Sequence, residues 1–352
     1  MILKKILSLA ASIINIFIII LFFSNSNAEE NNIKYYSKDL GTLSLMYHRF
    51  DENKYPSTNI RMNVFRDQID MIIRNNLNFY NPDKFDRNFK NPKKEKKILI
   101  TIDDAFSSFY NNAWPYLKEK KIPFILFVST KPVGNSGYMT WEQIKEVEKE
   151  NFAFIGNHSH SHEYLVKYPF EDFRNDIDTS IEILKKNIGY NPIFFSYPFG
   201  EYSLLQKQYI AKKFKFGFGQ NSGVIDLNKD VFELPRFPIN EKYGDLKRFN
   251  FLVDLLPLQY KSLLPNDKFI TESKNNPPFV KIDFFEEQKN INNINCYSNN
   301  GSDWSKTEIV YFNKSLKLNF TEKFNLRRGR INCSLNDEQG WRWLGIQFTF
   351  KN

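Results

Sequence analysis

Two short segments about fifty residues apart hold side chains that could bind a metal. The first, Ile100-Thr101-Ile102-Asp103-Asp104, is an apolar run that ends in two carboxylates. The second, Asn157-His158-Ser159-His160-Ser161-His162, contains three of the four histidines in the chain. Carboxylate oxygens and imidazole nitrogens are common ligands of divalent cations. One carboxylate and two imidazoles could therefore hold a metal, which leaves the second carboxylate free to act as a base in a hydrolytic reaction.

Local geometry divides the roles within these two segments. His158 and His162 are four residues apart, a spacing that places both rings on one face of a helical turn and directs His160 elsewhere, in a structural or outer role. Adjacent carboxylates cannot point the same way from the end of a strand, so one of Asp103 and Asp104 would bind the metal while the other faces the substrate. Taken alone, the Asp-Asp pair could equally be a helix cap.

Strand-like and helix-like segments alternate from residue 42 to about 256 and would position these side chains. Apolar runs predict strands at 43–48, 98–102, 124–128, 152–155 and 193–197. Helical spacing and capping residues, including Asn63 and Thr140, predict helices at 63–73, 109–120, 141–150, 173–188 and 204–214. This alternation predicts a parallel α/β sheet, and the number of units favours a closed or partly closed barrel.

The chemically suggestive residues follow predicted strands. Asp103 and Asp104 follow one strand, His158 follows another, and Pro198-Phe199-Gly200 follows a third. In α/β barrels, this carboxyl-terminal edge carries the active site.

Beyond the predicted barrel, the pattern changes twice. Residues 259–278 are polar, contain Pro and Asn, and are interpreted as a linker. Residues 279–352 alternate with period 2, which predicts a small β-sandwich. Its two cysteines, Cys296 and Cys333, are predicted to form a disulfide in an oxidising compartment, with two free buried thiols as the alternative.

Residues 1–28 are typical of a signal peptide. Lys4 and Lys5 precede the mostly apolar stretch Ile6 to Phe23, and small residues stand before Glu29. We therefore expect an exported protein, periplasmic or extracellular. The apolar stretch is close to the length that spans a bilayer, so an uncleaved anchor is the alternative, and membrane contact is expected only in that case.

Composition fits a globular protein with room for more than one domain: 352 residues, of which 41% are hydrophobic and 25% charged. The net charge is +9, or +7 without Lys4 and Lys5. No basic run is interleaved with aromatic residues, so we expect no nucleic-acid partner and interpret the charge as solubility or attraction to anionic envelope polymers. The 35 Phe and 18 Tyr would suit sugar-stacking surfaces, but low-GC codon bias explains them equally well.

These motifs resemble those of the NodB-homology polysaccharide deacetylases, carbohydrate esterase family 4, over about residues 42–245. Ile100–Phe106 resembles the Thr-Phe-Asp-Asp-Gly motif, His158–His162 the family's motif that begins with His-Ser/Thr and ends in His, and Tyr197–Gly200 the Pro-Tyr-Gly motif. Leu45–Arg49 is similar to the opening strand of the poly-N-acetylglucosamine deacetylase branch. The resemblance implies a distorted (β/α) barrel over residues 42–258. It also implies a divalent-metal hydrolase that removes N-acetyl groups from N-acetylglucosamine-containing polysaccharides or oligosaccharides.

The resemblance also implies individual roles. Asp104, His158 and His162 would hold the metal, which we expect to be Zn, with Co, Ni or Fe as alternatives. Asp103 would be the general base that draws a proton from the attacking water, and the backbone N–H of Phe199 would stabilise the oxyanion.

The sequence departs from the family pattern at three places. Ala105 replaces the motif glycine, which matters only if that position needs a positive φ. Ser196 stands near where many members carry an arginine that pairs with the base. Arg236 is our candidate to supply that charge, and an ordinary surface arginine is the alternative. The late histidine of the family is absent, because no histidine follows His162.

His48, the only histidine outside the cluster, is therefore the candidate general acid or substrate contact. A structural histidine bonded to a backbone carbonyl is the alternative. Two other enzyme functions are alternatives, an O-acetyl deacetylase and a peptidoglycan deacetylase. The missing arginine and late histidine also keep open an inactive glycan-binding or assembly protein.

Overall fold

A computed structural model describes residues 40–85, 97–226, 229–300 and 303–351. All of them belong to one compact unit, residues 34–352. The predicted signal peptide, residues 1–28, lies outside the described residues, so its presence and cleavage stay predictions. Within the described ranges, no helix combines the length and the apolar character needed to cross a bilayer.

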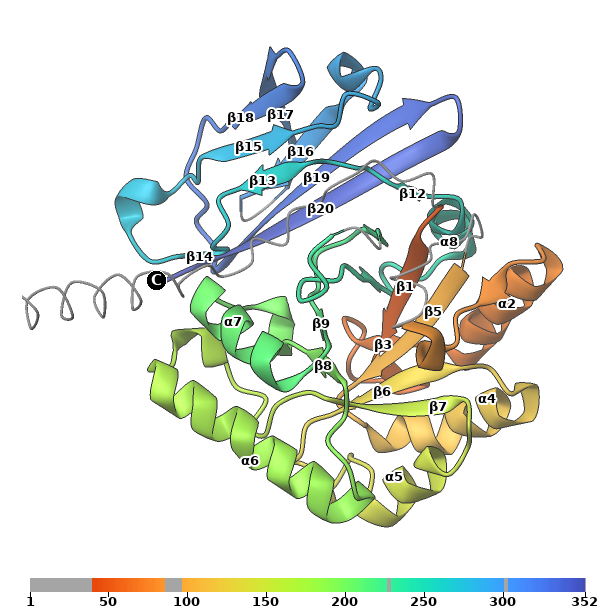
Figure 1. The fold of residues 1–352 in the computed structure, drawn as a ribbon. Helices are drawn as coiled ribbons and strands as arrows, with labels where there is room; N and C mark the ends of the chain where they lie inside the picture. The colour runs from red at the N-terminus through yellow and green to blue at the C-terminus, as the bar shows by residue number, and fades with distance from the viewer. Residues whose placement is uncertain (1–39, 86–96, 227–228, 301–302, 352) are drawn as a thin grey trace, which may run out of the picture. The chain divides into compact units, whose positions relative to one another are not determined.

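A sheet of parallel strands, hydrogen-bonded in chain order, carries the predicted site (Figure 1). Its main strands are β1 (Thr42–Tyr47), β5 (Lys97–Asp103), β6 (Phe124–Val128), β7 (Ala153–Asn157), β8 (Phe194–Ser196) and β9 (Phe216–Phe218). Three short strands join this sheet at β1 and β5: β4 (Asn78–Phe79), β10 (Val224–Ile225) and β11 (Phe237–Pro238). A separate pair, β2 (Arg49–Phe50) and β3 (Asn59–Ile60), follows β1. The predicted strands are thus confirmed to within a few residues.

A segment after β9 connects the two ends of this sheet. Leu234 forms a parallel bridge with Phe218 in β9, and Phe237 in β11 pairs with Leu45 in β1. Residues 234–238 therefore cross from the last main strand to the first, so that the barrel is partly closed. The predicted distorted (β/α) barrel is confirmed.

Helices pack against the outer face of the barrel sheet (Figure 1). They are α2 (Met62–Arg74), α4 (Trp114–Lys120), α5 (Trp141–Glu148), α6 (Phe170–Ile188), α7 (Leu204–Lys213) and α8 (Leu246–Val253). Short helical turns are η1 (Pro82–Lys84), η2 (Phe109–Ala113), η3 (Leu165–Lys167), η4 (Pro198–Gly200), η5 (Ser273–Asn275) and η6 (Ile291–Asn293).

The helix starts show which capping predictions hold. Thr140 caps α5 through a complete capping box, as predicted. The prediction that Asn63 caps its helix is wrong: α2 begins at Met62, whose N–H donates to the Asp51 carboxylate at 2.8 Å. A distant carboxylate thus replaces the local cap.

Strand alternation decides which side chains enter the barrel. In β5, Ile98, Ile100 and Ile102 pack in the cluster beneath the helices, whereas Leu99 belongs to a second cluster that also contains Phe127 and Phe218 from other strands. Because strand side chains alternate with period 2, Thr101 and Asp103 face the same way as Leu99. The apolar pattern of β5 therefore directs Asp103 into the barrel.

The C-terminal region is a second sheet, with the order β12-β20-β19-β16-β17-β18-β15-β13. Its strands are β12 (Leu256–Pro257), β13 (Ser262–Leu264), β14 (Phe269–Ile270), β15 (Val280–Asp283), β16 (Asn295–Asn299), β17 (Trp304–Phe312), β18 (Ser315–Asn319), β19 (Arg328–Asp337) and β20 (Gly340–Phe350). One half of β17 pairs with β16 and the other with β18, so the strands predicted to form a sandwich are continuous through β17.

The structure tests two of the predictions for the C-terminal region. Cys296 and Cys333 are cross-strand partners on β16 and β19 and form the predicted disulfide. The stretch 259–278, expected to be a linker, contributes β13 and β14, which pair with β15 and β20. The stretch is polar because its strands are short and lie at a sheet edge. Strands of this length leave no alternating apolar pattern in the sequence.

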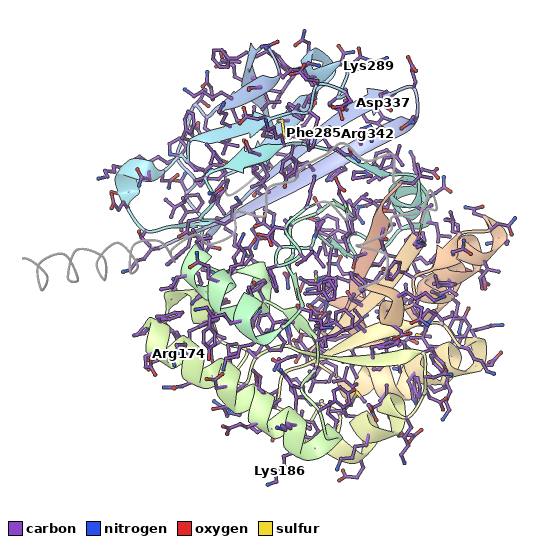
Figure 2. The ribbon with its side chains drawn as sticks, in the orientation of Figure 1. Arg174, Lys186, Phe285, Lys289, Asp337 and Arg342 are labelled. Carbon is purple, nitrogen blue, oxygen red and sulfur yellow. A yellow bond between two sulfur atoms is a disulfide. The ribbon has the colours of Figure 1, made fainter. Side chains whose placement is uncertain are left out.

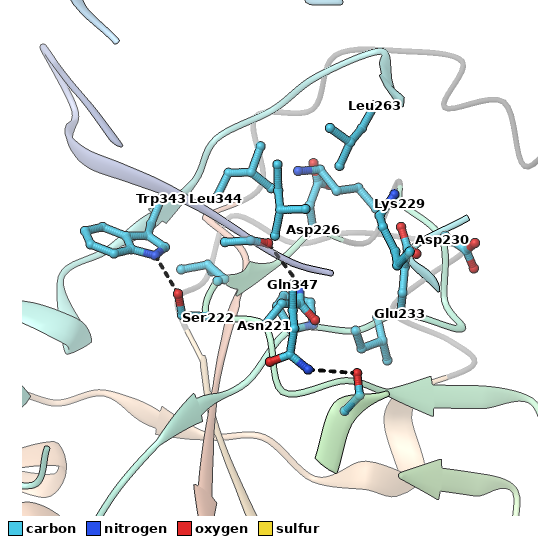
Figure 3. Close-up of a pocket in the computed structure, with 18 of the residues that line it drawn as sticks. Asn221, Ser222, Asp226, Lys229, Asp230, Glu233, Leu263, Trp343, Leu344 and Gln347 are labelled. Atoms are coloured by element: carbon cyan, nitrogen blue, oxygen red, sulfur yellow. Dashed lines mark hydrogen bonds between the residues drawn. The ribbon is translucent and has the colours of Figure 1, made fainter. Parts of the chain in front are cut away.

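Strand β20 connects the C-terminal sheet to the barrel. The Trp343 indole donates to the Ser222 hydroxyl at 3.0 Å (Figure 3). The Gln347 amide donates to the carbonyls of Phe199 and Gly200, each at 3.1 Å. A Cβ atom placed on Gly345 would lie 2.1 Å from the carbonyl oxygen of Ser222. The absence of a side chain at Gly345 therefore permits this close approach.

We expect Gly345→Ala to lower the free energy of unfolding by roughly 1–3 kcal/mol, because the new methyl group forces backbone atoms apart. Chemical denaturation would measure the change. Ser305→Ala, at an exposed position of β17 in the same sheet, is the matched control and should leave stability nearly unchanged. Equal stability of the two variants would contradict the close approach.

Candidate metal centre and active site

The backbone after β5 separates the two adjacent carboxylates. Asp104 and Ala105 both have left-handed conformations, with φ of 75° and 55°. This turn leaves Asp103 fully buried inside the barrel and directs Asp104 toward the histidines. The position that lacks the motif glycine does have a positive φ, so Ala105 holds a conformation that costs an L-residue about 1–2 kcal/mol. Strain of this kind is typical of functional sites.

Asp104, His158 and His162 converge as a possible three-ligand metal site. One ligand atom from each lies within 4.8 Å of the other two. The Asp104 Oδ1 atom is 3.1 Å from Nε2 of His162 and 3.4 Å from Nε2 of His158. Asp104 Oδ1 and His158 Nε2 are buried, and neither has a hydrogen-bond partner among the described residues. Buried polar atoms are rarely left unpaired, so two of them aimed at one point fit a bound cation.

The histidine segment reaches this geometry without a helix. Residues 158–162 form a loop, so the predicted helical turn is wrong. Positive φ values of 69° at Ser159 and 56° at His162 bring the rings together instead. The Asp176 carboxylate accepts the backbone N–H groups of His160 and Ser161 at 2.8 and 3.0 Å, which fixes the loop from helix α6.

Hydrogen bonding selects the tautomer of His158. Its Nδ1 lies 2.7 Å from the carbonyl oxygen of Ser196, and because a carbonyl can only accept, Nδ1 carries the proton. Burial lowers the pKa of His158 to about 4, so the ring is neutral near pH 7. The unprotonated Nε2 therefore directs its lone pair toward Asp104. This tautomer of a neutral imidazole is the form that binds a metal.

Charge interactions between the other two possible ligands complement this arrangement. Burial alone would lower the pKa of His162, but the Asp104 carboxylate raises it above its usual value. Burial alone would raise the pKa of Asp104, but His162 holds it below its usual range. Asp104 is therefore an anion, and with two imidazoles it forms a donor set that suits Zn and also fits Co, Ni or Fe.

Arg236 binds Asp103 through two parallel hydrogen bonds. Its guanidinium nitrogens lie 2.7 and 2.8 Å from the two carboxylate oxygens. The remaining N–H groups donate to Thr101 Oγ1, the Ser196 hydroxyl and the Gly219 carbonyl. All five N–H donors are thus used, and Arg236 is fully buried, which excludes the surface-arginine alternative. Its charge helps to hold the pKa of Asp103 below its usual range, against the effect of burial.

Phe199 and His48 lie close to the centre. Phe199 has φ of 58°, and the centroid of its ring is 4.9 Å from that of His162. His48 follows β1 and is near enough to Asp104 and Asp103 for their charges to raise its pKa, although burial dominates and lowers it. The structure therefore brings together the side chains predicted from sequence, and their catalytic roles stay proposals.

His160 and two residues that were not predicted from the sequence complete the surroundings of the site. His160 is outside the metal cluster, with Nδ1 2.8 Å from the Thr130 hydroxyl. Sequence reasoning missed Asp176, which holds the histidine loop, and Arg327, which reaches the site from the C-terminal region. Neither belongs to a motif or follows a barrel strand, so no local signal identified them.

Comparisons with known proteins match the barrel part of the chain. Residues 90–216 match the family model described as polysaccharide deacetylase. A poly-β-1,6-N-acetyl-D-glucosamine N-deacetylase of Staphylococcus aureus is 24% identical over 248 residues, which cover 61% of this chain and 85% of the relative.

Two solved structures share the fold. The Streptococcus pyogenes deacetylase PplD in complex with acetate has a TM-score of 0.54 and 24% identity, covering 58% of this chain and 95% of that one. IcaB from Ammonifex degensii has a TM-score of 0.54 and 24% identity, covering 60% of this chain and 97% of that one.

We expect Arg236→Met to lower the free energy of unfolding by about 3–5 kcal/mol, because it leaves the Asp103 carboxylate buried without a partner. The double variant Arg236→Met/Asp103→Asn removes both charges and should recover part of this loss. Chemical denaturation of both single variants and the double variant would measure the coupling. Strictly additive effects of the two substitutions would contradict a direct ion pair.

Proposed function

We propose, from the match of residues 90–216 to the polysaccharide deacetylase family model, that the chain is a metal-dependent hydrolase that removes N-acetyl groups from an N-acetylglucosamine-containing polysaccharide or oligosaccharide. The observation that carries the proposal is the convergence of Asp104, His158 and His162 beside the Asp103–Arg236 pair. The relative from Staphylococcus aureus, named for activity on an N-acetylglucosamine polymer, favours this substrate over an O-acetylated one. The disulfide fits action outside the cytoplasm.

The fit of the three donors to a cation defines what the centre could do. When bound there, a divalent cation supplies Lewis-acid polarisation of the acetamide carbonyl and acidifies the attacking water. We expect Zn at this centre. The buried and otherwise unpaired Asp104 Oδ1 and His158 Nε2 atoms support the assignment of both residues as ligands.

Three groups of the chain would handle the proton and the developing charge. Asp103, kept ionised by Arg236, accepts a proton from the attacking water. The backbone N–H of Phe199 donates to the oxyanion. His48 donates a proton to the departing amine; burial lowers its pKa, and the charges of Asp104 and Asp103 favour the imidazolium that this step needs.

The first test of this function is acetate release from β-1,6-linked and β-1,4-linked N-acetylglucosamine oligomers. We expect release to stop when a chelator removes the metal and to return when Zn is added. Alanine substitution of His162 should abolish both metal content, measured by elemental analysis, and turnover. His160→Ala removes a neighbouring imidazole that is not a ligand and should retain both.

The outcomes separate the proposed function from its alternatives. If acetate is released only from O-acetylated sugars, or only from peptidoglycan, that glycan replaces the proposed N-acetylglucosamine polymer as the substrate. Bound metal without acetate release from any of these glycans would favour a glycan-binding protein.

We expect His48→Ala to lower kcat by about 10²- to 10⁴-fold, because amine departure loses its proton donor. Circular dichroism and metal content should match those of the wild type. His160→Ala again serves as the matched control, with nearly unchanged kcat. A folded, metal-loaded His48→Ala enzyme with wild-type kcat would remove this residue from the mechanism.

A further inference from the structure

The start of strand β19 carries a positively charged cluster that touches the rim of the centre. The Arg327 guanidinium lies 3.6 Å from the centroid of the Tyr164 ring and 5.5 Å from that of Phe199. The Tyr164 and Phe199 ring centroids are 4.3 Å apart, and Phe199 in turn contacts His162. Tyr164 is 41% exposed. A continuous, partly open surface therefore leads from a possible metal ligand to Arg327.

One carboxylate faces several cations in this cluster. Glu201, which is buried, binds Arg327 at 2.8 Å and lies 3.6 Å from Nε of Arg328. Arg330 is exposed and forms no ion pair with any described residue, and Lys167 adds further positive charge near Glu201. Burial and the neighbouring charge of Arg330 lower the pKa of Arg328, as expected where cations are not fully compensated.

The strand register shows where Arg330 points. Residues 328, 330 and 332 share one face of β19 because side chains alternate. On either side of Arg330, this face touches the barrel: Arg328 faces Glu201, and Asn332 accepts a hydrogen bond from the Ser222 hydroxyl at 2.7 Å. The intervening Arg330 therefore faces toward the barrel, yet its side chain remains accessible to solvent.

Packing between the two sheets explains only part of this cluster. The Arg327–Glu201 pair is buried on one side and can stabilise the junction. Arg330 is exposed, forms no ion pair with any described residue, and repels the charge of Arg328, so its contribution to the stability of the fold is small. Arginine is also the side chain best suited to bidentate binding of carboxylates and phosphates. The excess positive charge thus indicates a ligand.

We propose that Arg327, Arg328 and Arg330 form a subsite for a negatively charged group, a carboxylate or phosphate, on a sugar unit next to the one that is deacetylated. This inference rests on the proposed function and narrows its substrate to an acidic or acid-substituted N-acetylglucosamine polymer. The aromatic surface of Tyr164 and Phe199 would lie beneath the intervening part of the glycan.

Matched polymers test this subsite with the full chain. The polymer that releases acetate in the preceding test is prepared in a carboxymethyl form, which is anionic, and a hydroxyethyl form, which is neutral and similar in size. We expect kcat/KM to be about tenfold higher for the carboxymethyl polymer at low ionic strength, and the advantage to shrink in 0.5 M salt. Arg330→Ala should remove most of this advantage and leave kcat/KM on the hydroxyethyl polymer unchanged.

Two further variants separate charge from structure. Arg330→Lys keeps the charge and should keep most of the preference. Lys289→Ala removes one positive charge from an exposed position between β15 and η6 and should change nothing (Figure 2). Thermal unfolding of all variants should match the wild type, because the side chain of Arg330 has no hydrogen-bond or ion-pair partner among the residues that the structure describes.

The possible failures are distinguishable. Equal kcat/KM on both polymers, or a preference that survives Arg330→Ala, overturns the subsite and leaves the proposed function intact. If no polymer releases acetate, the proposed function fails. Affinity electrophoresis in gels containing each polymer then tests the subsite directly, with stronger retardation of the wild type than of Arg330→Ala in the carboxymethyl gel as the expected result. Equal retardation would overturn it.

Discussion

The buried ion pair between Asp103 and Arg236 connects the fold to the chemistry of the site. Two charges inside a barrel are costly to desolvate, and this pair is tolerated because both carboxylate oxygens and all five guanidinium N–H groups are satisfied. Arg236 can reach Asp103 only because residues 234–238 cross from β9 to β1. The segment that closes the barrel therefore also supplies the cation that keeps Asp103 ionised. A substitution that separated residues 234–238 from β9 or β1 would therefore affect Asp103, the candidate base, before it affected the possible metal ligands.

Ser196 links this pair to the histidines. Its hydroxyl accepts a hydrogen bond from Arg236, while its carbonyl accepts the Nδ1 proton of His158. The same residue thus helps to orient the guanidinium and fixes the tautomer that leaves His158 Nε2 free. An arginine at position 196 would have to place its guanidinium in space that Arg236 now fills. The small side chain of Ser196 therefore leaves space for Arg236. The positive charge beside Asp103 comes from the segment 234–238 and not from the end of β8.

Motif spacing predicted the barrel and the side chains that converge at the candidate site, because both depend on local order. Strand ends and alternation place Asp103, Asp104 and His158 at one edge, whatever the loops do. The conformation of the histidine segment was not predictable from the i, i+4 spacing, since bonds from Asp176 on a distant helix hold it as a loop. The positive φ of Ala105 was likewise hidden, because only the assembled turn shows that the position needs it. Arg327 lies more than a hundred residues from the centre in the chain, and no local pattern carries that information.

The C-terminal sheet contributes to the surroundings of the site as well as to its own fold. Gln347 on β20 donates to the carbonyls of Phe199 and Gly200, so the peptide proposed to stabilise the oxyanion is held from outside the barrel. Phe199 has a left-handed conformation that an L-residue adopts at a cost, and contacts on both sides are what maintain such a conformation. Gln347 holds the carbonyl side of this residue, while His162 and Tyr164 pack against its ring. Residues on both sides of the domain boundary predicted at residue 258 thus lie together around one candidate site.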